Sequence, residues 1–151
     1  MGKLAEMMRY ILYKSEEEWV LLIDEIQFLR NYVEVENIRY RSAITISFDM
    51  QGIDENGKIS PLLLLPFIEN AFKHGIQEEE KTGFVEILIC KTGQELITEI
   101  KNSIARTNQN SGGIGLANVK KRLSLLYPKK HLLEIQDDGN VYQVSLTIIL
   151  E

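Results

Sequence analysis

Four side chains that could do chemistry lie close together in the segment ENAFKHGI, which runs from Glu69 to Ile76. They are an acid, an amide, an amine and an imidazole, carried by Glu69, Asn70, Lys73 and His74. At about 100° per helical residue, these four fall at roughly 0°, 100°, 40° and 140° around the axis, counted from Glu69. The segment therefore predicts a helix with one polar side facing a cleft and one apolar side that must be buried.

The uncharged amide of Asn70 is the feature that most favours a ligand site over an ordinary surface. It adds little to solubility, but its oxygen can bind a hard cation such as Mg²⁺, which keeps much of its water shell. The neighbouring carboxylate of Glu69 can hold a water molecule or act as a base. The alternative is a solvated helix face on which Glu69 and Lys73 form an ion pair four residues apart. The residues alone leave both interpretations open.

The ends of this helix carry sequence signals. Ser60 and Pro61 are typical of an N-cap and a first helical position. Pro66 must end or kink what precedes it, because it lacks an N–H. We therefore expect a regular helix that begins at or just after Pro66 and stops at Gly75.

A second informative stretch, NSIARTNQNSGGIG, runs from Asn102 to Gly115 and ends in three glycines, Gly112, Gly113 and Gly115. Its length and polarity are typical of a mobile lid or a disordered connection. Glycines at the start of a helix let backbone N–H groups approach an anion, which the helix dipole also favours. A plain flexible hinge is the alternative. In the helix that follows, we expect a solvated basic face made of Lys120, Lys121 and Arg122.

Composition sets the broad class. The chain has 151 residues, 44% of them hydrophobic, which is enough for a real core. A net charge of -5 and a sequence pI near 5.2 argue against nucleic acid as a partner. No apolar run approaches the roughly 18 residues of a membrane span. Cys90 is the single cysteine, so we expect no disulfide framework and a reducing compartment.

The remaining pattern predicts an α+β sandwich, a largely antiparallel sheet covered on one face by helices. Helices are expected over 1–13 and, after a capping box of Ser15 and Glu18, as far as about Tyr40. Tyr127 and Pro128 should stop the last helix. Strands are expected over 41–50, 84–90, 95–101, 132–136 and 141–150, with tight turns at Thr92–Gly93 and Asp137–Asn140.

ENAFKHGI and GGIGLANVKKRLSLLYP (112–128) resemble the N-box and the second glycine box of LytS-type sensor histidine kinases. MRYILY and NIRYR resemble the segment after that family's phosphoacceptor helix. The resemblance covers nearly the whole chain. It implies a Bergerat (GHKL) ATP-binding domain, a two-layer α/β sandwich whose mixed, mostly antiparallel sheet has helices on one face. Residues 1–41 would be a helical segment following the dimerisation and phosphoacceptor region, and 42–151 the catalytic domain.

The resemblance also implies roles for single residues. Asn70 would bind Mg²⁺ on the phosphates of ATP, and Glu69 would lie beside the metal and assist proton transfer. Lys73 and His74 would point toward phosphate or ribose, with Lys73 also catalytic. The remaining nucleotide-binding positions would be Asn102 at the adenine and, at the phosphates, Gly113, Gly115 and Leu116.

Two departures from the family pattern matter. Where the first glycine box DxGxG is expected, the chain reads NSIAR, so the uncharged Asn102 replaces the adenine-contacting Asp, and Ile104 and Arg106 replace glycines. We expect weaker nucleotide binding as a result. The phosphoacceptor motif, a sequence like NPHFLFN, is absent from the chain. We therefore expect a piece of a longer protein that cannot phosphorylate itself.

The function that the resemblance implies is the ATP-dependent catalytic domain of a two-component sensor histidine kinase. The γ-phosphate would pass to an upstream histidine and then to a response regulator. The domain would be the cytoplasmic part of a bacterial homodimer anchored in the membrane by segments outside this chain. One alternative is a degenerate, non-catalytic GHKL module acting through protein contacts. Another is a different GHKL ATPase or an anti-sigma-type serine kinase, which would not account for MRYILY and NIRYR.

Overall fold

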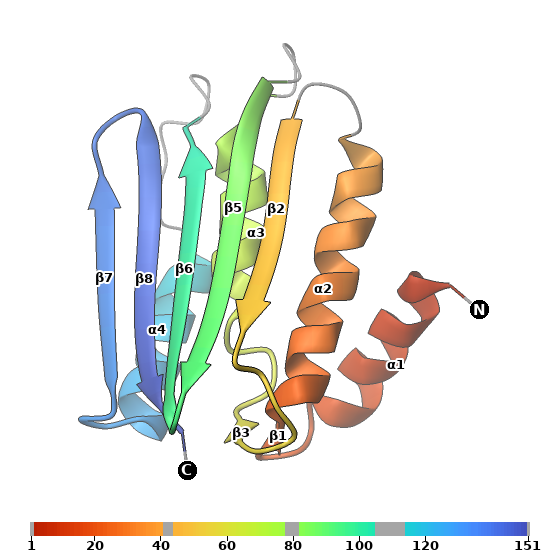
Figure 1. Ribbon diagram of the computed structural model, residues 1–151, viewed down its shortest axis with the longest axis vertical. Helices are drawn as coiled ribbons and strands as arrows, with labels where there is room; N and C mark the ends of the chain where they lie inside the picture. Colours follow the sequence, from red (N-terminus) through yellow and green to blue (C-terminus); the bar gives the residue numbers. More distant parts are fainter. Residues whose placement is uncertain (1, 41–43, 78–81, 105–113, 151) are drawn as a thin grey trace.

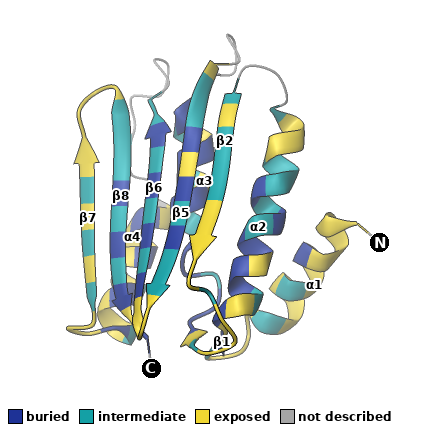
Figure 2. Cartoon of the chain, in the orientation of Figure 1, coloured by how far each residue is buried: buried dark blue, intermediate teal, exposed yellow. Residues whose placement is uncertain are grey.

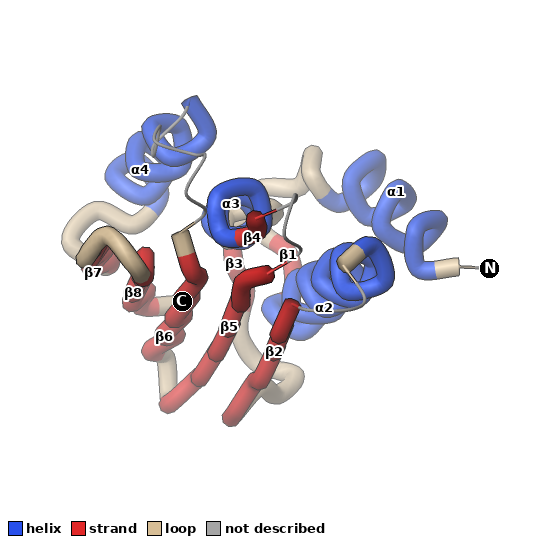
Figure 3. The backbone as a smooth tube through the Cα atoms, turned by 90° about the horizontal axis from the view of Figure 1, so that it is seen from above, coloured by secondary structure: helices blue, strands red, loops and turns tan. Residues whose placement is uncertain are grey.

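The computed structural model describes residues 2–40, 44–77, 82–104 and 114–150. Within these ranges, helices cover one face of a mixed β-sheet (Figures 1 and 3), which confirms the predicted α+β sandwich. The helices are α1 (Lys3–Lys14), α2 (Leu22–Arg39), α3 (Leu65–Gly75) and α4 (Ile114–Leu126). Seen from above, α3 lies between α2 and α4 (Figure 3).

The sheet has the strand order β2-β5-β6-β8-β7. The bounds are β2 (Ile44–Gln51), β5 (Thr82–Thr92), β6 (Glu95–Ser103), β7 (His131–Asp137) and β8 (Val141–Ile149). β2 and β5 pair in parallel, whereas β5–β6, β6–β8 and β7–β8 are antiparallel. The short β4 (Ile76–Gln77) pairs with β5, and β1 (Val20–Leu21) pairs with β3 (Lys58–Ile59) outside the main sheet. The parallel pair arises because α3 carries the chain back to the end of the sheet where β2 began.

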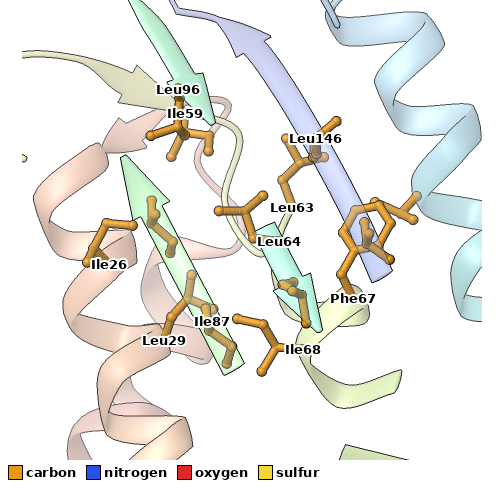
Figure 4. Close-up of a cluster of buried hydrophobic side chains, with 14 of the residues drawn as sticks. Ile26, Leu29, Ile59, Leu63, Leu64, Phe67, Ile68, Ile87, Leu96 and Leu146 are labelled. Carbon is orange, nitrogen blue, oxygen red and sulfur yellow. The ribbon is translucent and has the colours of Figure 1, made fainter. Parts of the chain in front are cut away.

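The core lies between the sheet and the helices, and its residues follow the expected periods. Alternate strand residues point toward the helices and are buried, as in Val85, Ile87 and Ile89 of β5. Figure 4 shows Ile87 in one cluster with side chains from α2, from the turn before α3 and from α3 itself, including Ile26, Leu29, Leu63, Leu64, Phe67 and Ile68. By contrast, α1 is largely exposed and packs on α2 (Figure 2).

Two predicted helix caps are wrong. Ser15 donates its hydroxyl to the Ile11 carbonyl at the end of α1, and α2 begins only at Leu22. The intervening Val20 is buried and paired with Ile59, so tertiary pairing sets the start of α2. Ser60 does not cap α3 either, because its hydroxyl accepts a hydrogen bond from Arg122.

Other boundaries were predicted correctly. α3 begins beside Pro66 and ends at Gly75, and both predicted hairpins form, with Gly93 in the left-handed region at φ +61°. The predicted lid falls mostly on residues 105–113, outside the described residues. Among the described helices, none is both long and apolar enough to cross a membrane.

Candidate functional site

The polar face of α3 is presented as its spacing predicts. The apolar side of the helix is buried against the sheet through Phe67, Ile68, Ala71 and Phe72. On the opposite side Glu69 and Lys73 are exposed, and Asn70 and His74 are half-buried. The packing of the apolar side therefore fixes which way the polar side chains point.

These side chains line a pocket of about 500 Å³ that faces the beginning of α4. Its lining residues are Pro66, Glu69, Asn70, Lys73, His74, Gly115 and Leu116. Six of the eight predicted site residues are thus brought together by two helices that are far apart in sequence. Of the other two, Gly113 lies outside the described residues, and Asn102 is not among the residues that line the pocket.

Asn102 lies on β6, directly behind the carboxyl end of α3. It is 1% exposed, and its Nδ2 donates to the Ser103 carbonyl at 2.9 Å. A Cβ added at Gly75 would lie 2.8 Å from the Asn102 Cβ, so the glycine is needed for this close approach. The Oδ1 of Asn102 is buried and has no hydrogen-bond partner among the described residues. An orphaned acceptor of this kind is costly unless something else satisfies it.

The end of α3 is tied to the sheet by a second polar side chain. Ser103 donates its hydroxyl to the Gly75 carbonyl at 2.7 Å and accepts from the Phe84 N–H at 2.9 Å. One hydroxyl therefore joins the last turn of α3, β5 and β6.

The electrostatics of the pocket favour a neutral imidazole beside an acid that holds its proton more tightly than usual. Although Glu69 is exposed, its partial burial raises its pKa, and the negative charge of Glu36 on α2 raises it further. Burial lowers the pKa of His74, and the positive charge of Lys73 lowers it further. The Nδ1 of His74 is also buried without a partner among the described residues. A neutral imidazole can donate or accept there, depending on its tautomer.

Sequence reasoning missed several residues around this site. It treated Pro66 only as a helix breaker, although Pro66 lines the pocket. The prediction that Arg122 belongs to a solvated basic face is wrong, since its guanidinium is half-buried and bonds to the turn before α3. Glu25 was not singled out, yet it is fully buried in the apolar stripe of α2. A charge inside such a stripe was the signal that could have revealed it.

Solved structures define the class of this fold. A histidine kinase domain from the Erythrobacter litoralis EL346 blue-light activated histidine kinase matches with a TM-score of 0.65 at 17% identity, covering 99% of this chain and 76% of that one. Histidine kinase ThkA, solved in complex with the response regulator protein TrrA, matches with a TM-score of 0.58 at 15% identity, covering 97% and 47%. The fold is that of the catalytic domain of histidine kinases.

Sequence relatives narrow the class. The Histidine kinase family matches residues 1–44. Sensor histidine kinase BtsS of Escherichia coli K12 is 31% identical over 112 residues, which are 73% of this chain and 20% of BtsS. Sensor protein LytS of Oceanobacillus iheyensis is 28% identical over a gapped alignment of 162 positions, which covers 95% of this chain and 28% of LytS. The chain is a homologue of the LytS-type sensor histidine kinases, and it spans less than a third of the length of these relatives.

Proposed function

We propose that the chain binds ATP with Mg²⁺ between α3 and α4 and acts as the catalytic domain of a sensor histidine kinase. The observation that carries this proposal is the pocket itself. It brings an acid, an amide, an amine and an imidazole of α3 opposite Gly115 and Leu116 at the start of α4. Phosphoryl transfer depends mostly on positioning and on neutralising charge, and such a set of groups can supply both.

The donor set suits a magnesium-bound nucleotide. Asn70 and Glu69 are neighbours that offer an amide and a carboxylate oxygen, the ligand types that Mg²⁺ prefers. When bound, the metal would neutralise charge on the phosphates. We assign Asn70 to the metal, Glu69 to a water or proton beside it, and Lys73 to the phosphates.

Two buried polar atoms without a hydrogen-bond partner among the described residues suggest where the rest of the nucleotide binds. Among the residues that the structure describes, neither His74 Nδ1 at the pocket nor Asn102 Oδ1 behind the end of α3 has a hydrogen-bond partner. We assign His74 to ribose or phosphate, and Asn102 Oδ1 to the exocyclic amino group of adenine, directly or through water. The backbone at Gly113, Gly115 and Leu116 would receive the phosphate tail, as helix N-termini do.

The first test is calorimetric titration of ATP into the chain with and without Mg²⁺. We expect saturable binding that Mg²⁺ strengthens and that Asn70→Ala weakens at least about tenfold, the loss of one metal ligand. Asn56→Ala in an exposed loop is the matched control and should leave the affinity unchanged. Absence of binding at millimolar ATP would overturn the proposal and favour a module that acts through protein contacts alone.

For the parent protein, we propose that the γ-phosphate passes to a histidine upstream of residue 1 and then to a response regulator. The regulator is supported by ThkA, which was solved with one. We further propose the division at residues 41 and 42, a homodimeric parent, and membrane anchoring through segments outside this chain. Radiolabelled ATP given to the parent, with Asn70→Ala alongside, tests the transfer. If the unmodified parent protein acquires no radiolabel on histidine, the proposed transfer is contradicted.

A further inference from the structure

The turn that leads into α3 is held by side chains from two other helices. Leu62 has φ +59°, a left-handed conformation that costs a leucine about 1 kcal/mol or more. Its N–H donates to Glu25 Oε1 of α2 at 2.7 Å, and its carbonyl accepts from Arg122 Nη1 of α4 at 3.3 Å. Without these partners, the turn would have little reason to keep this conformation.

Arg122 binds three consecutive residues of the turn. Its Nη2 donates to Ser60 Oγ at 2.6 Å and to the Pro61 carbonyl at 2.9 Å, in addition to the bond from Nη1 to Leu62. Tyr127, at the end of α4, accepts from the Ser60 N–H at 3.1 Å. Helix α4 is therefore attached to the same turn from which α3 begins.

This attachment bears on the pocket because the two helices form its walls. α3 begins at Leu65, immediately after the turn, and α4 carries Gly115 and Leu116 in its first turn. A guanidinium is rigid and planar, and it can bridge several acceptors at once. Arg122 therefore links both walls of the pocket to one turn.

Tyr10 brings α1 into this arrangement. Its hydroxyl donates to Glu25 Oε2, the oxygen that does not bind Leu62, and its ring stacks on Phe28 of α2 at 4.7 Å. Glu25 is 0% exposed, so water cannot replace a donor that leaves. Figure 1 shows α1 on the outer side of α2, away from the sheet, so its effect on the pocket must pass through such contacts. A shift of α1 would remove the Tyr10 hydroxyl from the Glu25 carboxyl and so change the hydrogen bond between Glu25 and the Leu62 N–H.

We propose that Tyr10, Glu25 and Arg122 are positioning residues for the pocket, because they hold the turn 60–63 and make the spacing of α3 and α4 depend on the position of α1. We call these three residues and the turn the Glu25 network. The inference rests on the proposed function only where it concerns nucleotide affinity. The mechanical link from α1 to the pocket walls can be measured without any ligand.

The test uses Tyr10→Phe, which removes one hydroxyl, with Tyr13→Phe as the matched control because Tyr13 lies on the same helix and is 70% exposed. Amide chemical shifts of the ¹⁵N-labelled chain are recorded without nucleotide. We expect Tyr10→Phe to move the resonances of Leu62, Asn70 and Leu116, whereas Tyr13→Phe should move only its neighbours in α1. Trp19 fluorescence gives a second readout, since the indole packs edge-on against Tyr127 at 5.9 Å.

Titration with magnesium ATP completes the test, at a temperature where every variant is folded. We expect Tyr10→Phe to change the affinity by about threefold to tenfold, the size of one hydrogen bond. The double variant with Glu25→Leu should bind ATP as Glu25→Leu alone does, because leucine offers neither Tyr10 nor Leu62 an acceptor. Arg122→Lys should change the ATP affinity more than Lys121→Gln does, since Lys121 lies on the exposed side of α4.

The outcomes separate the two proposals. Shift changes confined to α1 and α2, with unchanged ATP affinity, would overturn the positioning role. Shift changes that reach Asn70 and Leu116 in a chain that does not bind ATP would support the network and overturn the nucleotide site. A Tyr10→Phe effect on ATP affinity that simply adds to that of Glu25→Leu would refute the route through Glu25.

Discussion

Replacing the buried acid of the Glu25 network should change how the stability of the protein depends on pH. Burial raises the pKa of Glu25 from 4.5 to about 7, against the opposing effects of the Tyr10 and Leu62 hydrogen bonds and the Arg122 charge. The folded chain therefore holds this proton more tightly than the unfolded chain. Between pH 4.5 and about 7 the folded state binds more protons, so the free energy of unfolding must fall as the pH rises through this range.

The size of the effect follows from the shift. A rise of about 2.5 pK units at 1.36 kcal/mol per unit corresponds to about 3 kcal/mol, present below pH 4.5 and lost by about pH 7. Glu25→Gln keeps the shape of the side chain and can still accept from Leu62, but it cannot ionise. The variant should therefore be close to the original chain at pH 5 and more stable than it at pH 8.

Urea unfolding followed by circular dichroism at pH 5 and pH 8 measures this difference. All other carboxyl groups are common to both proteins and cancel in the comparison. Glu18→Gln, at an exposed position before α2, is the control and should show no such dependence. The reasoning is refuted if the difference between Glu25→Gln and the original chain is the same at both pH values. A difference of opposite sign would mean that the partners of Glu25 outweigh its burial.

Two further predictions concern single positions in the core. Thr98 is 1% exposed and its hydroxyl has no partner among the described residues, so Thr98→Val should raise the free energy of unfolding by about 1 kcal/mol. Thr147→Val, on the open face of the sheet, is its control and should lie within about 0.5 kcal/mol of the original chain in the same urea titration. Gly75→Ala would press a methyl group against Asn102 and should cost about 1–3 kcal/mol, whereas Gly2→Ala has nothing within 4 Å and should be neutral by thermal unfolding.

The parts of the fold that could be predicted are those fixed by local pattern. Alternation in 84–90 and 95–101 around Gly93 required an antiparallel hairpin, and the structure has one. The polar face of α3 was predictable because its apolar residues leave only one side free. The parallel pairing of β2 with β5 was not visible locally, since alternation gives a strand its faces but not its neighbour.

The parts that could not be predicted depend on contacts between distant residues. Ser60 has the residue type of an N-cap, and Pro61 follows it as expected. Its hydroxyl instead accepts a hydrogen bond from Arg122, which is 62 residues away in the sequence, so the local pattern could not reveal this contact. Asn102 was matched to the adenine position by resemblance, but its burial against Gly75 could be learned only from the packing. Its role toward a nucleotide stays a prediction.

The turn before α3 also has a consequence for how the chain folds. Its bonds reach residues 37 positions earlier, at Glu25, and 60 positions later, from Leu62 to Arg122. Neither α2 nor α4 can hold the turn alone. The turn that starts α3 is therefore stable only after both long loops have closed, and each closure costs conformational entropy. If the turn opened locally, the buried carboxyl of Glu25 and the guanidinium of Arg122 would both lose their hydrogen-bond partners in the turn. The Leu62 amide should therefore exchange with solvent only when the whole chain unfolds, making α2, α3 and α4 one cooperative unit.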